Sequence, residues 1–258
     1  MSEKRETILR LLQDEAGRIL DVKIFQEATP GTETPEEPET PEEPETPGKP
    51  LTVIELRADG ESCTLCFLTP GTVVDWGDGE TTVVTEETPQ ELTHHYSSPA
   101  STPTRLVTID GEVDVPKGIA FSPLLSDGLV AVRALGGLRG ETSSLFRNHS
   151  HLKRVAPEVA EGLRGKSDLS YAFMGCLALE EIPAGLLDGC PEISDITQCF
   201  AYCSELRGES PYTLVEGRKI KLWERDGSFG LQPIPKHDQA FVQCTGLSDY
   251  DEIPEDWK

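Results

Sequence analysis

The sequence predicts a multi-domain protein of mixed α/β class, with an N-terminal helix, a disordered Pro/Glu linker, a small β-sandwich and a short solenoid of repeats. Three observations lead to this prediction. A Phe-x-x-Cys-x-x-Leu pattern returns in the second half of the chain, a Thr/Pro/Glu-rich stretch lies near the start, and strand-like alternation lies between them. We place the four parts at residues 1–25, 26–50, 51–116 and 117–258.

Residues 1–25 are expected to form an amphipathic helix. Leu9, Leu12, Ala16 and Ile19 follow one another at spacings of three and four residues, which places them on one face of a helix. A seam this short is marginal alone. We therefore expect the helix to anchor the chain, by joining copies of it or by docking on a virion or anchor protein. The alternative is a helix that packs on its own chain.

Residues 26–50 are expected to form a linker. The hexapeptide Glu-Thr-Pro-Glu-Glu-Pro occurs at 33–38 and again at 39–44. Proline favours extended polyproline geometry, and neighbouring glutamates repel one another. The segment is therefore predicted to be a semi-rigid spacer without a ligand of its own.

Residues 51–116 are expected to form the β-sandwich. Asp78-Gly79 stands between two runs rich in Thr and Val, at 72–74 and 81–84. Asp and Gly tolerate the positive φ that two-residue hairpin turns require. A later run at 105–109 also alternates as a strand does. These signals predict short antiparallel strands around a small core.

The same region resembles a known family. Val74-Asp75-Trp76-Gly77-Asp78-Gly79, followed by His94-His95-Tyr96, is similar to the signature of polycystic-kidney-disease (PKD) domains. The resemblance implies an immunoglobulin-like sandwich in which Trp76 anchors the core and His94 is structural.

Residues 117–258 are expected to form the solenoid. The repeat phenylalanines are separated by 27, 27 and 41 residues, and such spacing is typical of stacked repeats. A unit of this size cannot bury its apolar face alone, so neighbouring units stack and align equivalent side chains in internal columns. The four units centre on Phe146, Phe173, Phe200 and Phe241.

These repeats also resemble a family. The segment Ala172-Phe173-Met174-Gly175-Cys176-Leu177-Ala178-Leu179-Glu180-Glu181-Ile182-Pro183 is similar to the repeat of BspA-like leucine-rich-repeat proteins, which are bacterial surface-type proteins. The first unit departs from the pattern because His149 stands where the others have Cys. The resemblance implies a leucine-rich-repeat solenoid and leaves the ligand open.

The 14 additional residues between the third and fourth units are expected to form a hairpin insertion near residues 209–237. Two alternating runs flank Glu216-Gly217, and aromatic and basic side chains gather there. Aromatic rings and arginines on a protruding element are typical of binding hot spots. Tyr212, Trp223 and Arg225 are therefore the binding candidates. The alternative is a hairpin that only caps the stack of repeats.

Cysteine usage favours packing over chemistry. Cys63-x-x-Cys66 has redox or metal spacing, but it lies in a predicted strand and no second such motif completes a zinc site. Cys176, Cys203 and Cys244 follow their Phe by three residues. We therefore predict buried, reduced thiols in the repeat column.

Several function classes are disfavoured. The formal net charge of −23 opposes nucleic acid as a partner, and no apolar run approaches the length of a membrane span. Asp75, Asp78 and Glu80 are conceivable calcium ligands, but turn chemistry accounts for Asp78, and Asp75 flanks Trp76 as in the PKD pattern. No catalytic motif is present. We predict no enzyme activity, no cofactor and no metal.

The predicted function is that of a non-enzymatic binding or adhesion protein that recognises a cell-surface glycan or protein. It would be displayed on a phage virion, as a fibre or tail component, or on a bacterial cell surface. The absence of a recognisable signal peptide at 1–12 favours the virion, whose proteins assemble where thiols stay reduced. The alternatives are a structural virion spacer or decoration protein without a specific ligand, and an accessory module of a hydrolase.

Overall fold

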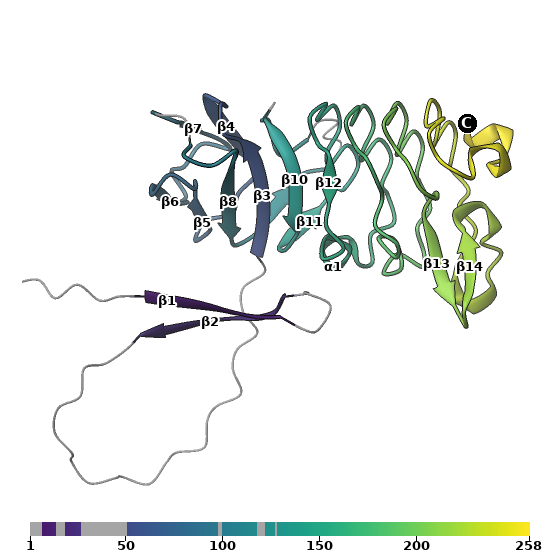
Figure 1. The fold of residues 1–258 in the computed structure, drawn as a ribbon, viewed down its shortest axis with the longest axis horizontal. Coiled ribbons are helices and arrows are strands. Elements are labelled where there is room, and N and C mark those ends of the chain that lie inside the picture. The colour runs from purple at the N-terminus through teal and green to yellow at the C-terminus, as the bar shows by residue number, and fades with distance from the viewer. Residues whose placement is uncertain (1–6, 14–18, 27–50, 98–99, 118–121, 127) are drawn as a thin grey trace, which may run out of the picture. The chain divides into compact units, whose positions relative to one another are not determined.

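The computed structural model describes the chain in six ranges and divides it into two compact units, residues 1–46 and 47–258 (Figure 1). Apart from Gln26, the predicted linker at 26–50 lies outside the described residues. The described ranges are residues 7–13, 19–26, 51–97, 100–117, 122–126 and 128–258.

The first unit is a two-stranded antiparallel ribbon. β1 (Thr7–Gln13) pairs with β2 (Ile19–Gln26). The predicted amphipathic helix at residues 1–25 is therefore wrong. The 3-4-3 spacing of apolar residues ends where β2 begins, and β-branched Val22 and Ile24 then alternate with charged residues, a pattern that favours a strand.

A six-stranded sheet forms one end of the second unit, here called the sheet end. Its strands pair antiparallel, except for the parallel pair at one edge. The strands of this sheet come from residues 51–155, and the last of them in sequence belongs to the first repeat. In the order in which they pair, the strands are β12 (Arg154–Val155), β10 (Leu129–Ala134), β3 (Leu51–Arg57), β8 (Thr104–Asp110), β5 (Val73–Asp75) and β6 (Thr81–Val83).

Two short ribbons complete the sheet end. β4 (Ser62–Cys66) pairs antiparallel with β7 (Glu91–His95), and β9 (Val113–Val115) pairs parallel with β11 (Leu138–Gly140). The predicted immunoglobulin-like sandwich is therefore wrong, since several small sheets take its place. The physical reason is the pairing of β3 with β10, which draws a later segment into the main sheet.

Trp76 lies in the core of the sheet end and is 1% exposed. Its indole N–H donates to Thr82 Oγ1 at 2.9 Å, and its ring stacks on the His94 ring with centroids 4.8 Å apart. The Tyr96 hydroxyl donates to the Trp76 carbonyl at 3.2 Å. The residues that resemble the PKD signature thus form one satisfied structural cluster.

Residues 144–258 form a series of stacked turns, here called the stacked end. Among the described residues, the single α-helix is α1 (Val159–Leu163), and the repeats contain isolated bridges where strands were expected. The predicted leucine-rich-repeat solenoid is therefore wrong, because that fold requires a strand in each repeat. The predicted mixed α/β class is likewise wrong, since the described residues are mostly strands and turns.

The turns have a local cause in the backbone. In every repeat, the residues two before and two after the Phe have positive φ, between 52° and 74°. Left-handed residues interrupt an extended chain, so each repeat Phe sits at the apex of a turn instead of inside a strand. The left-handed residues are Ser144 and Asn148, Tyr171 and Gly175, Gln198 and Tyr202, and Gln239 and Gln243.

Backbone hydrogen bonds join each turn to the next. Phe146 N–H donates to Ala172 O at 2.6 Å, Phe173 N–H to Cys199 O at 2.8 Å and Phe200 N–H to Ala240 O at 2.9 Å. The four turns therefore lie side by side, along the upper edge in Figure 1, while α1 and the hairpin lie at the lower edge.

The predicted burial of the repeat phenylalanines is confirmed. All four are at most 1% exposed, and their rings follow one another at centroid distances of 5.3, 5.3 and 5.4 Å. The column then continues to Trp257, whose ring stacks on Phe241 at 6.5 Å. This file of rings and the buried Leu, Ile, Val and Cys side chains of the repeats together form the core of the stacked end.

The predicted burial of the repeat cysteines is also confirmed. Cys176, Cys203 and Cys244 are free thiols, fully buried, and each donates to the carbonyl of the preceding repeat Phe at 2.9–3.1 Å. Burial raises the pKa of Cys176 to about 12. In the first turn, His149 fills the same position with its Nδ1 3.1 Å from Ser126 O.

The insertion between the last two turns contains an antiparallel hairpin, β13 (Tyr212–Val215) and β14 (Arg218–Lys221). Its turn residues Glu216 and Gly217 have φ of 49° and 79°, the left-handed pair that matches the twist of a two-residue hairpin. Four single-turn 3₁₀ helices follow, at Leu222–Glu224, Ser228–Gly230, Tyr250–Glu252 and Glu255–Trp257.

Candidate functional site

The candidate site is a groove beside the base of the hairpin. It has a volume of about 660 Å³ and is lined by residues within the segments 180–184 and 205–212. These segments leave the second and third turns and meet through the hydrogen bond from Arg207 N–H to Glu180 O at 2.8 Å. The stacking of two repeats thus builds the groove from residues that the Phe column does not need.

Charged groups dominate the groove. Four carboxylates and one guanidinium line it. Arg207 pairs with Glu205 at 3.0 Å, and Glu209 pairs with Lys219 of the hairpin at 2.5 Å. The carboxylates of Glu180 and Glu181 have no ion-pair partner among the described residues. The groove therefore offers acceptors for hydroxyl, amide or amino groups.

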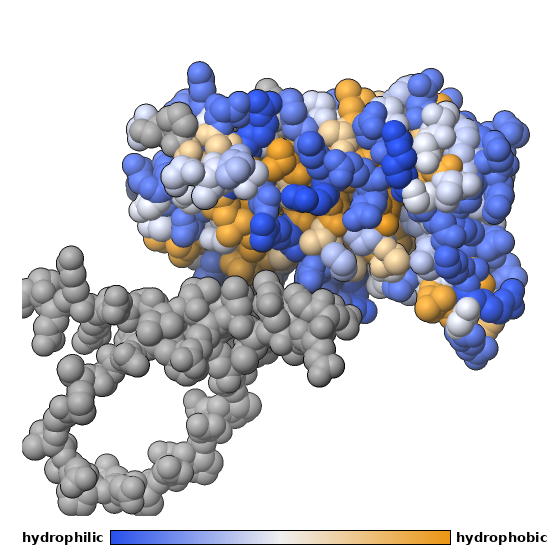
Figure 2. Space-filling view, in the orientation of Figure 1, coloured by the Kyte–Doolittle hydropathy of each residue, from blue (hydrophilic) through white to orange (hydrophobic). Residues whose placement is uncertain are grey.

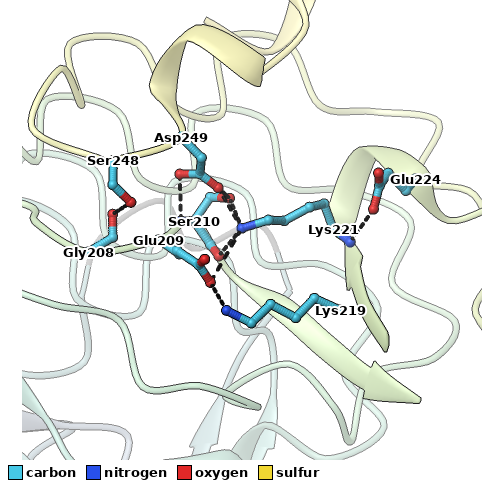
Figure 3. A network of polar contacts seen from close by, with 8 residues as sticks. All are labelled: Gly208, Glu209, Ser210, Lys219, Lys221, Glu224, Ser248 and Asp249. Carbon is cyan, nitrogen blue, oxygen red and sulfur yellow. Dashed lines mark hydrogen bonds and ion pairs between the residues drawn. The ribbon is translucent and has the colours of Figure 1, made fainter. Parts of the chain in front are cut away.

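A polar network that includes Glu209 and Ser210 of the groove lies beside it (Figure 3). Lys221 Nζ lies 2.5 Å from Asp249 Oδ2, and the two side chains are 11% and 8% exposed. Ser210 Oγ donates to the same carboxylate at 2.6 Å, and Ser210 N–H donates to its other oxygen at 2.9 Å. Burial by itself raises the pKa of Asp249, but the hydrogen bonds from Lys221 and Ser210 outweigh it and lower the pKa.

Tyr212 is the one predicted binding residue that lines the groove. It is partly exposed at the start of β13. The Lys219 ammonium lies 4.6 Å from the centre of its ring, and the Lys221 ammonium lies 5.3 Å from it. These cation–π contacts hold the ring in place beside the groove.

Trp223 is directed toward the core. It packs edge-on against Phe241 at 6.4 Å and against Trp257 at 6.1 Å between ring centroids. Its ring therefore packs against the side of the aromatic column. Such packing is what the alternative interpretation, a hairpin that caps the stack of repeats, would require.

Arg225 is buried, at 5% exposure. Its guanidinium donates to Cys190 O at 2.9 Å, to Leu187 O at 3.4 Å and to Thr213 Oγ1 at 3.3 Å. Burial lowers the pKa of this group. The guanidinium ties the insertion to the second repeat and does not line the groove.

Sequence reasoning missed the Lys221–Asp249 pair. Its members are 28 residues apart and belong to no repeat position, so no spacing pointed to it. The cluster of basic residues on the hairpin can be recognised in the sequence, but the carboxylates that pair with it cannot. Glu209 and Asp249 neutralise Lys219 and Lys221, so the cluster offers little net positive charge to an acidic partner.

The other residues considered for chemistry have structural contacts. Asp75 Oδ1 accepts from Gly77 N–H at 2.9 Å and Asp78 Oδ1 from Glu80 N–H at 3.1 Å, as turn residues do. His94 Nε2 lies 2.8 Å from Asp78 Oδ2. Burial by itself raises the pKa of Asp78, but its hydrogen bonds with His94 and Glu80 lower it. In the described part of the chain, no three His, Cys, Asp or Glu side chains gather as metal ligands.

The Cys63-x-x-Cys66 pair lies on strand β4 and is buried. Burial raises the pKa of Cys63 to about 12 and that of Cys66 to about 11. Such thiols stay protonated at neutral pH and are poor nucleophiles. Nor does any helix in the described ranges have the length and apolar character needed to cross a membrane.

We compared the chain with protein-family models, curated proteins and solved structures, and none of the three comparisons found a match. The resemblance to PKD and BspA-like proteins stays a prediction, and the geometry of the groove carries the functional argument.

Proposed function

We propose that the chain is a non-enzymatic binding or adhesion protein, displayed on a phage virion as a fibre or tail component or on a bacterial cell surface. It recognises a cell-surface glycan or protein. The observation that carries this proposal is the groove between the second and third turns, with Tyr212 on its wall and four carboxylates and Arg207 around it.

The groove has the properties of a recognition site. Its volume of about 660 Å³ lies within the range of ligand pockets. An aromatic ring covers apolar ligand surface at low entropic cost, and carboxylate and guanidinium groups supply directional hydrogen bonds. The ion pairs with Lys219 and Lys221 hold Glu209 and the Tyr212 ring in position, which reduces the cost of ordering them on binding.

The contacts of Ser210 support binding over catalysis. A serine nucleophile needs a nearby base to accept its proton. Ser210 is fully buried, and its hydroxyl donates to Asp249, which is already paired with Lys221. The hydroxyl is therefore part of a structural ion-pair network and lacks access to a substrate.

The thiols support the virion as the place of display. All seven cysteines are unpaired and buried. Unpaired cysteines are typical of proteins that fold in a reducing compartment, where virion proteins are assembled. The motif resemblance to bacterial surface-type proteins belongs to the same proposal.

Binding is tested with the full chain on a glycan array and on intact bacterial cells. Replacing Tyr212→Ala is expected to weaken binding at least about tenfold, as truncation of an interface aromatic does. The matched control is Phe229→Ala, an aromatic residue 55% exposed outside the groove. Binding that survives Tyr212→Ala would contradict the groove as the site, and absence of binding to any glycan or cell would favour the structural spacer.

Attachment is assigned to the first unit, either to a second copy of the chain or to an anchor protein. Residues 1–46 form a compact unit of their own. Light scattering on the full chain and on residues 47–258 tests this. Oligomers that persist without residues 1–46 would contradict self-association through the first unit.

A further inference from the structure

A second surface stands apart from the groove. We call it the turn face, defined as the outer surface of the five residues centred on each repeat Phe, 144–148, 171–175, 198–202 and 239–243. The four turns lie along the upper edge in Figure 1, whereas β13 and β14 lie at the lower edge. The turn face and the hairpin therefore belong to opposite edges of the stacked end.

The turn face is unusual in charge. Asp and Glu make up 46 of the 258 residues, more than one in six, yet none of the twenty residues of the turn face is acidic. Arg147 is its one charged residue. The remaining partly or fully exposed positions are uncharged; they are Asn148, Tyr171, Met174, Gly175, Gln198, Tyr202, Gln239, Val242 and Gln243.

Two tyrosines of the turn face occupy a backbone conformation that disfavours them. Tyr171 and Tyr202 have φ of 59° and 65°. Gly and Asn adopt this left-handed conformation with little conformational energy, whereas bulky side chains are uncommon in it. The other turns have Asn148, Gly175 and Gln243 at the positions equivalent to Tyr202. An aromatic residue at such a position reduces stability, so its presence points to a role outside folding.

Packing does not explain Tyr202. Its side chain is 42% exposed, and its hydroxyl has no hydrogen-bond partner among the described residues. Tyr171 is partly exposed and lies 5.3 Å from the Arg147 guanidinium, measured from the ring centroid. Both rings thus present surface to a ligand.

The turn face is also regular and rigid. Hydrogen bonds join successive turns, and the Phe rings buried beneath the turn face follow one another at a spacing of 5.3–5.4 Å. The Gln198 amide donates to the Gln239 amide at 2.9 Å across adjacent turns. Each amide carries both donor and acceptor groups.

We propose that the turn face binds a neutral glycan chain. Tyr171 and Tyr202 stack on the C–H faces of sugar rings, and Gln198, Gln239 and Gln243 donate to and accept from sugar hydroxyls. A neutral ligand fits because an anionic one meets a chain of charge −23, and a cationic one finds no carboxylate on this surface. This site is independent of the groove and of the function proposed for it.

The test uses the full chain and three neutral hexasaccharides, cellohexaose, maltohexaose and chitohexaose, with the cationic chitosan hexamer and the anionic galacturonate hexamer as comparators. Binding is measured by titration calorimetry and by ligand-observed NMR. We expect at least one neutral hexasaccharide to bind with a Kd of about 1 mM or tighter. Because no charge pairing is involved, raising the salt from about 0.05 to 0.5 M is expected to change the Kd less than about twofold.

The key variant is Y171N/Y202N, because Asn is compatible with positive φ and preserves the backbone. It is expected to weaken binding at least about tenfold. The matched control is Phe229→Asn, since Phe229 is also an exposed aromatic residue with positive φ, 55°, but lies outside the turn face. Phe229→Asn is expected to leave the Kd unchanged, and Tyr212→Ala reports whether the hexasaccharide occupies the groove instead.

Three results would overturn the proposal. The first is that no neutral hexasaccharide binds, the second is that Y171N/Y202N binds as the parent does, and the third is that only the chitosan hexamer binds and does so with steep salt dependence. Loss of hexasaccharide binding in Tyr212→Ala alone would assign the sugar to the groove. Circular dichroism and the melting temperature of each variant show that the fold is intact.

Discussion

The sheet end and the stacked end of residues 47–258 both have to pair their backbone hydrogen-bonding groups and to bury an apolar core, and they do so by different means. In the sheet end, strands of two to seven residues pair edge to edge, and alternate side chains enter the core. In the stacked end, the hydrogen bonds run from one turn to the next, and a file of stacked rings runs through a core that also contains buried Leu, Ile and Cys side chains. The N–H and C=O groups of a backbone without long strands can therefore be paired when successive repeats form the same turn and stack on one another.

The two ends also differ in backbone strain. Ten described residues other than Gly have positive φ, and nine of them lie in the stacked end, with Phe67 the exception. Sheet pairing keeps residues in the extended region, whereas each turn around a repeat Phe requires two left-handed residues. The stacked end thus depends on its aromatic column to offset a less favourable backbone.

The largest expected effect comes from removing one ring from each core. Trp76→Ala in the sheet end and Phe200→Ala in the stacked end are each expected to lower the free energy of unfolding by about 3–5 kcal/mol. Both side chains are at most 1% exposed, and Phe200 stacks on a ring at each side. Urea unfolding followed by circular dichroism and by tryptophan fluorescence measures both changes.

The same experiment tests whether the ends unfold together. Residues 47–258 form one compact unit with one continuous core, so the two probes are expected to give coincident transitions. Exposed Val83→Ala and Leu177→Ala serve as controls, with changes within about 0.5 kcal/mol. Separate transitions, with Trp76→Ala and Phe200→Ala each shifting only one, would show two independent cores.

The next effect concerns the Lys221–Asp249 pair, for which the sheet end has no equally buried counterpart among the described pairs. Asp249→Ala is expected to reduce stability by about 3–5 kcal/mol, because it leaves a buried ammonium without its partner. Chemical denaturation at pH 7 measures this loss. A Lys221→Met/Asp249→Leu double variant that is as unstable as Asp249→Ala would contradict this reason.

Acid pH provides an independent measurement on the same pair. The folded state lowers the pKa of Asp249 below its ordinary value of 3.8, so the stabilisation is complete above about pH 5 and is lost as the pH falls through the folded-state pKa. Asp249→Asn is therefore expected to lose less stability than the parent between about pH 5 and pH 2. Glu87→Gln, at an exposed position, is expected to leave the acid profile unchanged.

The sequence predicted the aromatic column and its buried thiols because a period of 27 residues brings equivalent side chains into register whatever the secondary structure. It did not predict the turns, since neither Tyr nor Gln signals positive φ. It also mistook the first segment for a helix, because Leu9, Leu12 and Ala16 satisfied a helical spacing that pairing with β2 overrides.

The candidate site was predicted only in part, for a related reason. Tyr212 lines the groove, but Arg225 and Trp223 pack inward, since an Arg or Trp in a short insertion is equally suited to closing a core. The groove itself depends on the approach of Glu180 to Arg207, one repeat later. Such contacts follow from how the repeats stack, which spacing alone does not specify.

A smaller effect is expected from glycine replacements that compare the two ends. Gly77 and Gly175 have nearly equal φ, 75° and 74°, but a Cβ at Gly77 would collide with the Leu106 carbonyl oxygen, whereas one at Gly175 would lie 2.6 Å from the movable Asn148 side chain. Gly77→Ala is expected to cost about 2–4 kcal/mol and Gly175→Ala about 1–2 kcal/mol. Thermal unfolding of both variants measures the order, and equal costs would show that φ alone decides.

The smallest effect tests whether the strain of the stacked end serves the turn face. Tyr202→Asn is expected to raise the free energy of unfolding by about 0.5 kcal/mol, because Asn adopts positive φ more readily and Tyr202 packs on little. Gln243→Asn, at the same position of the next turn with φ of 66°, is the control that relieves strain without removing an aromatic ring. If Tyr202 is retained for binding, Tyr202→Asn gains stability and loses glycan affinity, whereas Gln243→Asn gains stability alone. A loss of stability in Tyr202→Asn would mean that the ring contributes packing, and the argument from strain to function would then fail.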